Sequence, residues 1–216
     1  MKPIYLNLSK PADKLPTGSS RFWGNPDLPN GTDYPTYTDE DGEEYHYEFV
    51  CQINLADIAA LDTEGILPHK GLLSFFAKID YYMGNFDNDS GISGYISDTD
   101  DVKVLFFPEV DDTFQEIVLI DDDDEQVNPM ELKINFAHSN KQYGSDHALL
   151  APPNHREWET WDPPYEDWQI LLQIDSDEGD DFHLNFLDWG VLDFLISPDD
   201  LRNHRFDNVR AIVLST

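Results

Sequence analysis

The apolar residues of this chain occur in short runs, and this pattern restricts the fold more than any other feature of the sequence. Gly, Pro, Asn and Asp bound the runs, and many of the residues within them are β-branched or aromatic. Runs of this length and composition predict strands rather than helices. We expect strands over residues 49–53, 72–79, 102–107, 117–120, 170–174, 191–196 and 209–214.

Helix signals are few. Asn54 is placed to cap a helix over residues 55–61, and Ser197 followed by Pro198 marks the start of a second, short helix. Sheet therefore dominates, and we predict an α+β fold of predominantly antiparallel sheet with short helices attached.

Two segments of the chain share one pattern. Each is an apolar strand that ends in Gln-Ile followed by Asn or Asp, and a later Gly opens another apolar strand. Gly71 follows Gln52 by 19 residues, and Gly190 follows Gln173 by 17 residues. The similar spacing predicts an internal duplication: a single domain over 1–216, with two similar halves at about 1–110 and 111–216.

The balance of charge limits the possible partners. Against 13 Lys and Arg residues stand 44 Asp and Glu residues, which gives a net charge of -31. Phosphate backbones and anionic lipid headgroups repel such a chain, so we expect neither nucleic-acid nor membrane binding and favour a basic protein partner. No apolar stretch is long enough for a signal peptide or a spanning helix, which predicts a cytoplasmic protein.

Recognised catalytic patterns are missing from the sequence. Gly-x-Ser-x-Gly, His-Glu-x-x-His and Gly-rich phosphate loops do not occur. Cys51, the single cysteine, lies within an apolar strand, so we interpret it as a buried, inert thiol. We therefore predict no catalytic residue and no cofactor, and favour a binding protein while leaving an enzymatic role open.

Acidic residues cluster after the second Gln-Ile pair. Asp175, Asp177 and Asp181 are spaced so that their carboxylates could converge on a hard cation such as Ca²⁺ or Mg²⁺. A solvated acidic turn explains the same residues, and it is the interpretation that we favour. A metal-assisted hydrolase built on clustered carboxylates is the alternative.

A segment rich in Trp and Pro occupies residues 152–168. Its Trp158 and Trp161 lie among acids, and exposed aromatic residues in such a setting suit a partner that carries Lys or Arg. Alternatively, the two side chains fasten the segment onto the sheet. A sugar or another small molecule is a further candidate ligand for this segment.

Several blocks of the chain together resemble a known family. The most characteristic block is Ser-Arg-Phe-Trp-Gly-Asn-Pro-Asp-Leu-Pro, and the blocks lie at residues 20–29, 52–55, 67–76, 168–177 and 190–201. The combination resembles the YwqG-like family of bacterial domains of unknown function, in which Gly is usual at the position of Trp23. This resemblance implies an α+β fold with a duplicated core, and it implies no activity.

Four residues of these blocks are candidate binding residues: Arg21, Trp23, Gln52 and Gln173. For Arg21 we expect an internal ion pair rather than a ligand contact, because the fork of a guanidinium can hold a carboxylate and fix a loop. The function that we expect is that of a non-catalytic acidic binding protein for a basic protein or peptide, of the immunity or inhibitor type. The sequence leaves the oligomeric state open.

Overall fold

A computed structural model describes residues 2–39, 41–79, 92, 94–121, 123–127, 130–140, 146–153, 161–178, 183–186 and 189–214. The protein is mostly β, with 40% strand and 7% helix, so the predicted α+β class is wrong. The helix-start signals at Asn54 and Ser197 do form caps, but they open helices of only four and five residues, α1 (Leu55–Ile58) and α2 (Pro198–Arg202). A cap fixes where a helix begins, and no apolar repeat follows these caps to extend the helices.

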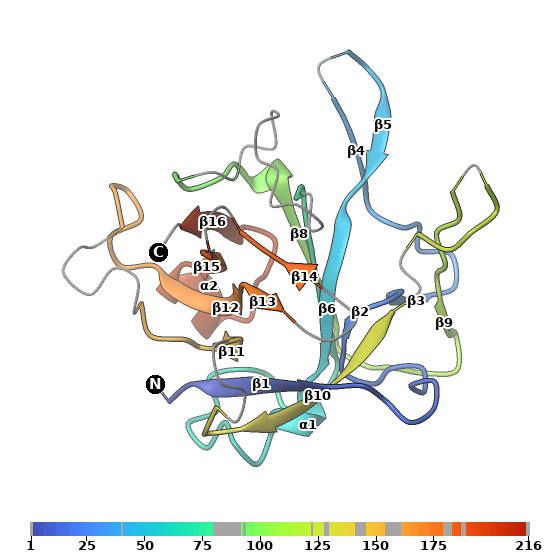
Figure 1. The fold of residues 1–216 in the computed structure, drawn as a ribbon. Helices are drawn as coiled ribbons and strands as arrows, with labels where there is room; N and C mark the ends of the chain where they lie inside the picture. Colours follow the sequence, from blue (N-terminus) through green and yellow to red (C-terminus); the bar gives the residue numbers. More distant parts are fainter. Residues whose placement is uncertain are drawn as a thin grey trace.

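One large antiparallel sheet forms the body of the protein (Figure 1). Its strands, in sheet order, are β16 (Arg210–Leu214), β15 (Val191–Ile196), β12 (Gln169–Asp175), β11 (Ala148–Leu149), β1 (Ile4–Ser9), β10 (Glu131–Ala137), β2 (Arg21–Trp23), β6 (Glu48–Asn54), β7 (Leu72–Ala77) and β8 (Val102–Phe107).

The sheet curls into a nearly closed barrel. The segment before β8, which contains the 3-10 helix η1 (Thr99–Asp101), lies against β16 at the other edge. There the Ser97 N–H donates to the Ala211 carbonyl at 2.8 Å, and the Gly94 N–H donates to the Val213 carbonyl at 2.9 Å. These bonds satisfy backbone groups that an open sheet would leave exposed at its edge.

Three pairs of short strands are attached to this body. They are β3 (Asp27–Pro29) with β9 (Phe114–Glu116), β4 (Thr36–Thr38) with β5 (Glu44–His46), and β13 (Asp177–Glu178) with β14 (His183–Leu184). The strand predicted over 117–120 is wrong, since an isolated bridge between Ile120 and Gln126 stands in its place. In the part of the chain that the structure describes, no helix is long and apolar enough to cross a membrane.

The strand order reads alike from both edges of the sheet. β8, β7, β6 and β2 run inward from one edge as β16, β15, β12 and β11 do from the other, and β10 and β1 meet at the centre. There Asn7 lies opposite Asn135, and each side-chain amide donates to the backbone carbonyl of the other residue at 3.2 Å. The same order of strands therefore occurs once at each edge of the sheet. The internal duplication of the sequence and its boundary near residue 110 stay predictions.

The two glycines of the repeated sequence pattern have the same structural role. Gly71 precedes β7, and a Cβ atom at this residue would lie 2.3 Å from the carbonyl oxygen of Phe107, the last residue of β8. Gly190 precedes β15, and a Cβ atom there would lie 1.9 Å from the carbonyl oxygen of Leu214, the last residue of β16. Both positions require Gly because a neighbouring strand end approaches too closely for any side chain.

Apolar side chains cover both faces of the large sheet. The barrel interior holds the main core, to which residues such as Phe22, Cys51 and Phe194 belong. On the outer face of the first half lies an aromatic cluster of Tyr34, Tyr47, Phe49 and Phe76, and on that of the second half a cluster of Ala148, Ala151, Trp161, Ile170, Leu195 and Ile212. Burial on both faces explains why the central strands are continuous apolar runs rather than alternating ones.

Candidate functional site

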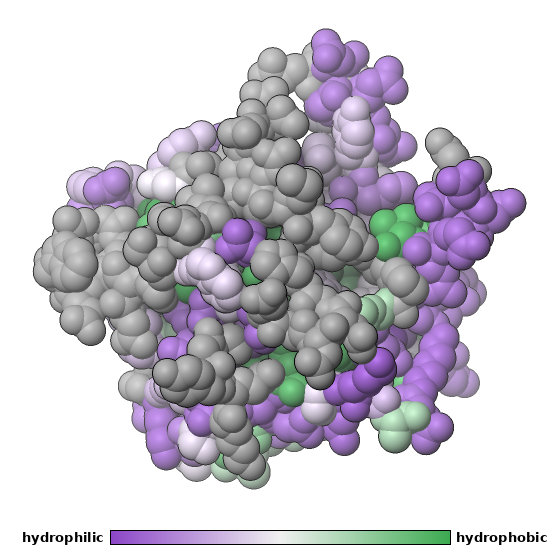
Figure 2. All heavy atoms as spheres, viewed as in Figure 1, coloured by the Kyte–Doolittle hydropathy of each residue, from purple (hydrophilic) through white to green (hydrophobic). Residues whose placement is uncertain are grey.

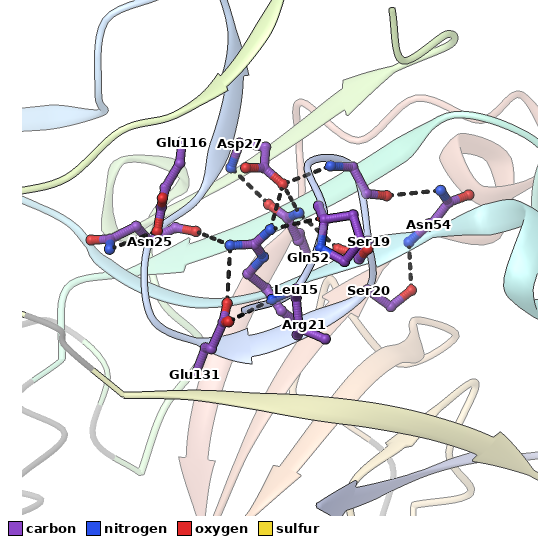
Figure 3. A network of polar contacts seen from close by, with 12 residues as sticks. Leu15, Ser19, Ser20, Arg21, Asn25, Asp27, Gln52, Asn54, Glu116 and Glu131 are labelled. Atoms are coloured by element: carbon purple, nitrogen blue, oxygen red, sulfur yellow. Dashed lines mark hydrogen bonds and ion pairs between the residues drawn. The ribbon is translucent and has the colours of Figure 1, made fainter. Parts of the chain in front are cut away.

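A buried ion pair holds the loop that precedes β2 (Figure 3). Arg21 is 1% exposed, and its Nη2 atom donates to Asp27 Oδ2 at 2.9 Å. Its Nη1 atom donates to Glu131 Oε2 at 3.2 Å. The guanidinium therefore lies under the surface between two carboxylates, which is the place expected of a residue that fixes a loop.

Gln52 of β6 completes this network. It lies opposite Arg21 in the sheet, and its Nε2 atom donates to Asp27 Oδ2 at 2.7 Å and to the Ser19 carbonyl at 2.8 Å. Its Oε1 atom accepts from the backbone N–H of Asp27 at 2.8 Å. The carbonyl and the amino group of the Gln52 side chain are thus both engaged within the protein, and the role of Arg21 and Gln52 as binding residues stays a prediction.

The second half contains a related but incomplete arrangement. Gln173 of β12 donates from Nε2 to the Asp146 carbonyl at 2.9 Å, as Gln52 does to Ser19. Ala148 lies opposite Gln173 on one side, where Arg21 lies opposite Gln52, and Asp193 lies opposite it on the other side, where the first half has Ser74. Sequence reasoning missed Asp193, although a charged residue within the apolar run 191–196 is a visible signal.

The candidate metal ligands Asp175 and Asp177 bind groups of the protein. Asp175 Oδ2 accepts from the Asp146 N–H at 2.8 Å, and the Asp175 N–H donates to His147 Nδ1 at 3.1 Å. Because Nδ1 accepts, the His147 ring is the neutral tautomer whose Nε2–H donates to Asp177 Oδ2 at 3.2 Å. Asp181 lies outside the described residues. Those described include no group of three His, Cys, Asp or Glu arranged to hold a metal.

The candidate Trp residues belong to the core where they are described. Trp23 is 7% exposed and has a φ of 54°, in the left-handed region that favours Gly, the residue usual at this position in the resemblance. Trp161 is 5% exposed and its Nε1–H donates to the Trp168 carbonyl at 3.1 Å. Trp158 lies outside the described residues. A cleft of about 330 Å³ adjoins Trp161, and Leu150, Ala151, Pro152, Pro153, Trp168, Gln169 and Ile170 also line it.

An exposed surface that combines acids with apolar residues lies over the outer aromatic cluster of Tyr34, Tyr47, Phe49 and Phe76. We call it the acidic face, and it consists of the described residues of the β4–β5 hairpin, 36–39 and 41–46, and of a second segment, 117–121 and 123–126. Both parts pack onto the outer aromatic cluster, the hairpin through Tyr37 and the segment through Ile117 and Leu119. Tyr45 is 48% exposed, Val118 37% and Ile120 58%. The exposed acids of the face are Asp41, Glu43, Glu44, Asp121, Asp123, Asp124 and Glu125.

No cation of the chain lies within the acidic face. Residues 22–69 and 104–132 contain neither Lys nor Arg. The two lysines packed nearest, Lys78 and Lys103, lie over the rings of Tyr37 and Tyr47, and each is paired with a carboxylate, of Asp101 and of Asp100. Figure 2 shows hydrophilic residues over the projecting hairpin and over the segment beside it. The sequence signal for the hairpin is Asp41-Gly42 between two short runs that each contain a Tyr.

Together, these features define a mostly β domain, built around one large sheet, whose buried polar groups hold its own loops. A family model described as Domain of unknown function (DUF1963) matches residues 20–213. The chain belongs to this family. No curated protein matches the chain. The narrower YwqG-like resemblance stays a prediction.

Proposed function

We propose that the protein is a non-catalytic, acidic cytoplasmic binding protein for a basic protein or peptide, and that the acidic face is its binding surface. The observation that carries this proposal is the exposure of Tyr45, Val118 and Ile120 among acids that form no ion pair with any described Lys or Arg. An immunity-type or inhibitor-type role fits such a surface.

The negative net charge of the protein attracts a basic partner before the two proteins touch. Most of the described Lys and Arg side chains form ion pairs within the chain, among them Lys14, Arg21, Lys70, Lys78, Lys103, Arg202, Arg205 and Arg210. The remaining field is therefore negative and attracts a basic partner, which increases the association rate and makes it depend on salt.

The exposed apolar residues of the acidic face offer contact area that a partner can bury, which charge alone does not provide. Tyr45 stacks on Tyr37 with ring centroids 5.8 Å apart, so its ring is held in place for a contact with a Lys or Arg side chain. Val118 and Ile120 alternate with the inward-facing Ile117 and Leu119, and their side chains give the surface apolar area that a partner can bury.

A pull-down from cell extract at two salt concentrations tests this proposal with a matched pair of variants. The first carries Tyr45→Ser, Val118→Ser and Ile120→Ser, and the control carries Tyr95→Ser, at a residue that is 63% exposed outside the acidic face. We expect a captured basic protein to be lost with the first variant and with high salt, and to be retained by the control. Capture that is equal for both variants would contradict the proposal.

The cleft beside Trp161 favours a second candidate function, the binding of a small molecule or sugar. Trp161 and Trp168 offer aromatic surfaces of the kind that stack on sugar rings and other flat apolar ligands. Quenching of Trp fluorescence by a panel of sugars tests this function. Saturable quenching that Trp168→Ala abolishes would support it, and the lack of any saturable quenching would exclude that panel as ligands.

A further inference from the structure

Arg21 of the first half has no charged counterpart at the corresponding position of the second half. Arg21 on β2 lies opposite Gln52, whereas Ala148 on β11 lies opposite Gln173. The long side chain is thus replaced by a methyl group. On the other side of Gln173 lies Asp193, a carboxylate that the first half lacks at the corresponding position.

Two buried oxygen atoms at this place have no hydrogen-bond donor. Gln173 is 2% exposed and Asp193 is 1% exposed, and neither Gln173 Oε1 nor Asp193 Oδ1 has a partner. The two residues are direct cross-strand neighbours, which places their Cβ atoms about 5 Å apart on one face of the sheet. Buried acceptors without donors are rare in folded proteins and destabilise them, so a pair of them points to a missing donor group.

The charged groups around Asp193 do not supply this donor. Burial first, and then the carboxylate of Asp175 on β12, raise the pKa of Asp193 well above its usual range. On the neighbouring strand β16, Arg210 donates instead to the Ser97 carbonyl at 3.2 Å and pairs with Asp98 at 3.6 Å. Among the described residues, no Lys, Arg or His forms an ion pair with Asp193.

We propose that the second half binds an external guanidinium group between Ala148, Gln173 and Asp193. A guanidinium has five N–H donors in one plane, so it can bond a carboxylate and an amide oxygen together. The group belongs either to a small free molecule or to an Arg side chain of a partner. The site shares no residue with the acidic face and does not depend on it.

Isothermal titration calorimetry with matched ligands tests the proposal and distinguishes the two sources. The ligands are methylguanidinium against neutral methylurea, and a peptide with one Arg against the same peptide with citrulline. We expect binding of the charged member of at least one pair, with tighter binding of methylguanidinium indicating a small ligand and tighter binding of the Arg peptide indicating a partner. Binding should strengthen as the pH rises and should release up to about one proton, because the cation favours ionised Asp193.

Two variants of equal net charge separate this site from the general attraction of an acidic protein for cations. Asp193→Asn should weaken binding about tenfold or more, whereas Asp199→Asn, at an exposed residue of α2, should leave it unchanged. Ala148→Arg should supply a guanidinium from within the chain and abolish binding. If Ala148→Arg does not fold, the Asp193→Asn comparison decides. Equal binding by both Asn variants, or no preference for the charged member in either ligand pair, would overturn the proposal.

Discussion

Removing the Arg21 side chain should destabilise the protein through the charges that it leaves behind. In Arg21→Ala, Asp27 stays fully buried and loses the guanidinium, and breaking a buried pair in this way costs about 3–5 kcal/mol. Asp27 Oδ2 keeps the donors Gly18 N–H, at 2.8 Å, and Gln52 Nε2, at 2.7 Å. Glu131 keeps the Leu15 N–H at 2.8 Å and is partly exposed. We therefore expect the lower end of the range, about 3 kcal/mol.

For a domain of this size, such a loss lowers the melting temperature by about 6–12 °C. Urea denaturation and thermal unfolding measure it, with Arg205→Ala as the control. Arg205 also pairs with two carboxylates, but it is 49% exposed and solvent screens its ion pairs, so its removal should destabilise the protein much less than that of Arg21. Asp27→Asn should reduce the effect of Arg21→Ala in the double variant. If Arg21→Ala costs no more than the control, the assignment of Arg21 to a buried structural pair is wrong.

Three further perturbations test other parts of the structure. In ligand-free protein, Asp193→Asn should raise the free energy of unfolding at neutral pH. The pKa of Asp193 is raised in the folded protein, so the stability of the natural chain falls as the pH rises above about 3.9. Urea denaturation curves at several pH values should show that the gain in stability of the variant becomes smaller towards acid pH. Gly190→Ala should lower the free energy of unfolding by more than about 4 kcal/mol. Gly31→Ala is the control and should lower it by about 1–2 kcal/mol, because Gly31 has a positive φ but open space around it. Equal losses of stability in the two denaturation curves would refute the steric argument. Burial first, and Asp100 next, raise the pKa of Tyr47 to about 12. The stability that its neutral phenol contributes should therefore be lost as the pH rises from about 10 through that value. An ultraviolet titration of Tyr47→Phe that is the same as that of the natural chain would contradict this assignment.

The strands that the sequence predicts well are those buried on both faces. β7 and β15 are apolar at nearly every residue, so their runs are visible without knowledge of the fold. β2 and β11 have only three and two residues, and no periodicity can be read from so few. The first helix was expected to extend to residue 61 and ends at Ile58, because a capping signal says nothing about how far packing will extend a helix.

The chemistry of the buried network could be predicted, but its partners could not. An Arg in a chain this acidic predicts an ion pair, and the structure places Arg21 in one. Asp27 is only six residues away, whereas Glu131 lies 110 residues away and comes close because β10 pairs with β2. The pairing of β10 with β2 joins strands from the two halves of the chain, and no local sequence pattern indicates it.

The acidic face is the central proposal, and the salt dependence of partner binding in two charge-matched variants tests it most directly. One variant neutralises Asp121, Asp123, Asp124 and Glu125 of the face, and the other neutralises the same number of exposed acids elsewhere, Glu64, Asp162, Asp167 and Asp207. Both variants have the same net charge, so any difference between them reports the position of the charges. With the partner isolated in the pull-down, the dissociation constant is measured at several salt concentrations. We predict that neutralising the face weakens binding about tenfold or more and flattens the salt dependence, while the other variant binds as the natural chain does. Equal weakening in the two variants would contradict a defined binding face and leave only the general charge of the protein.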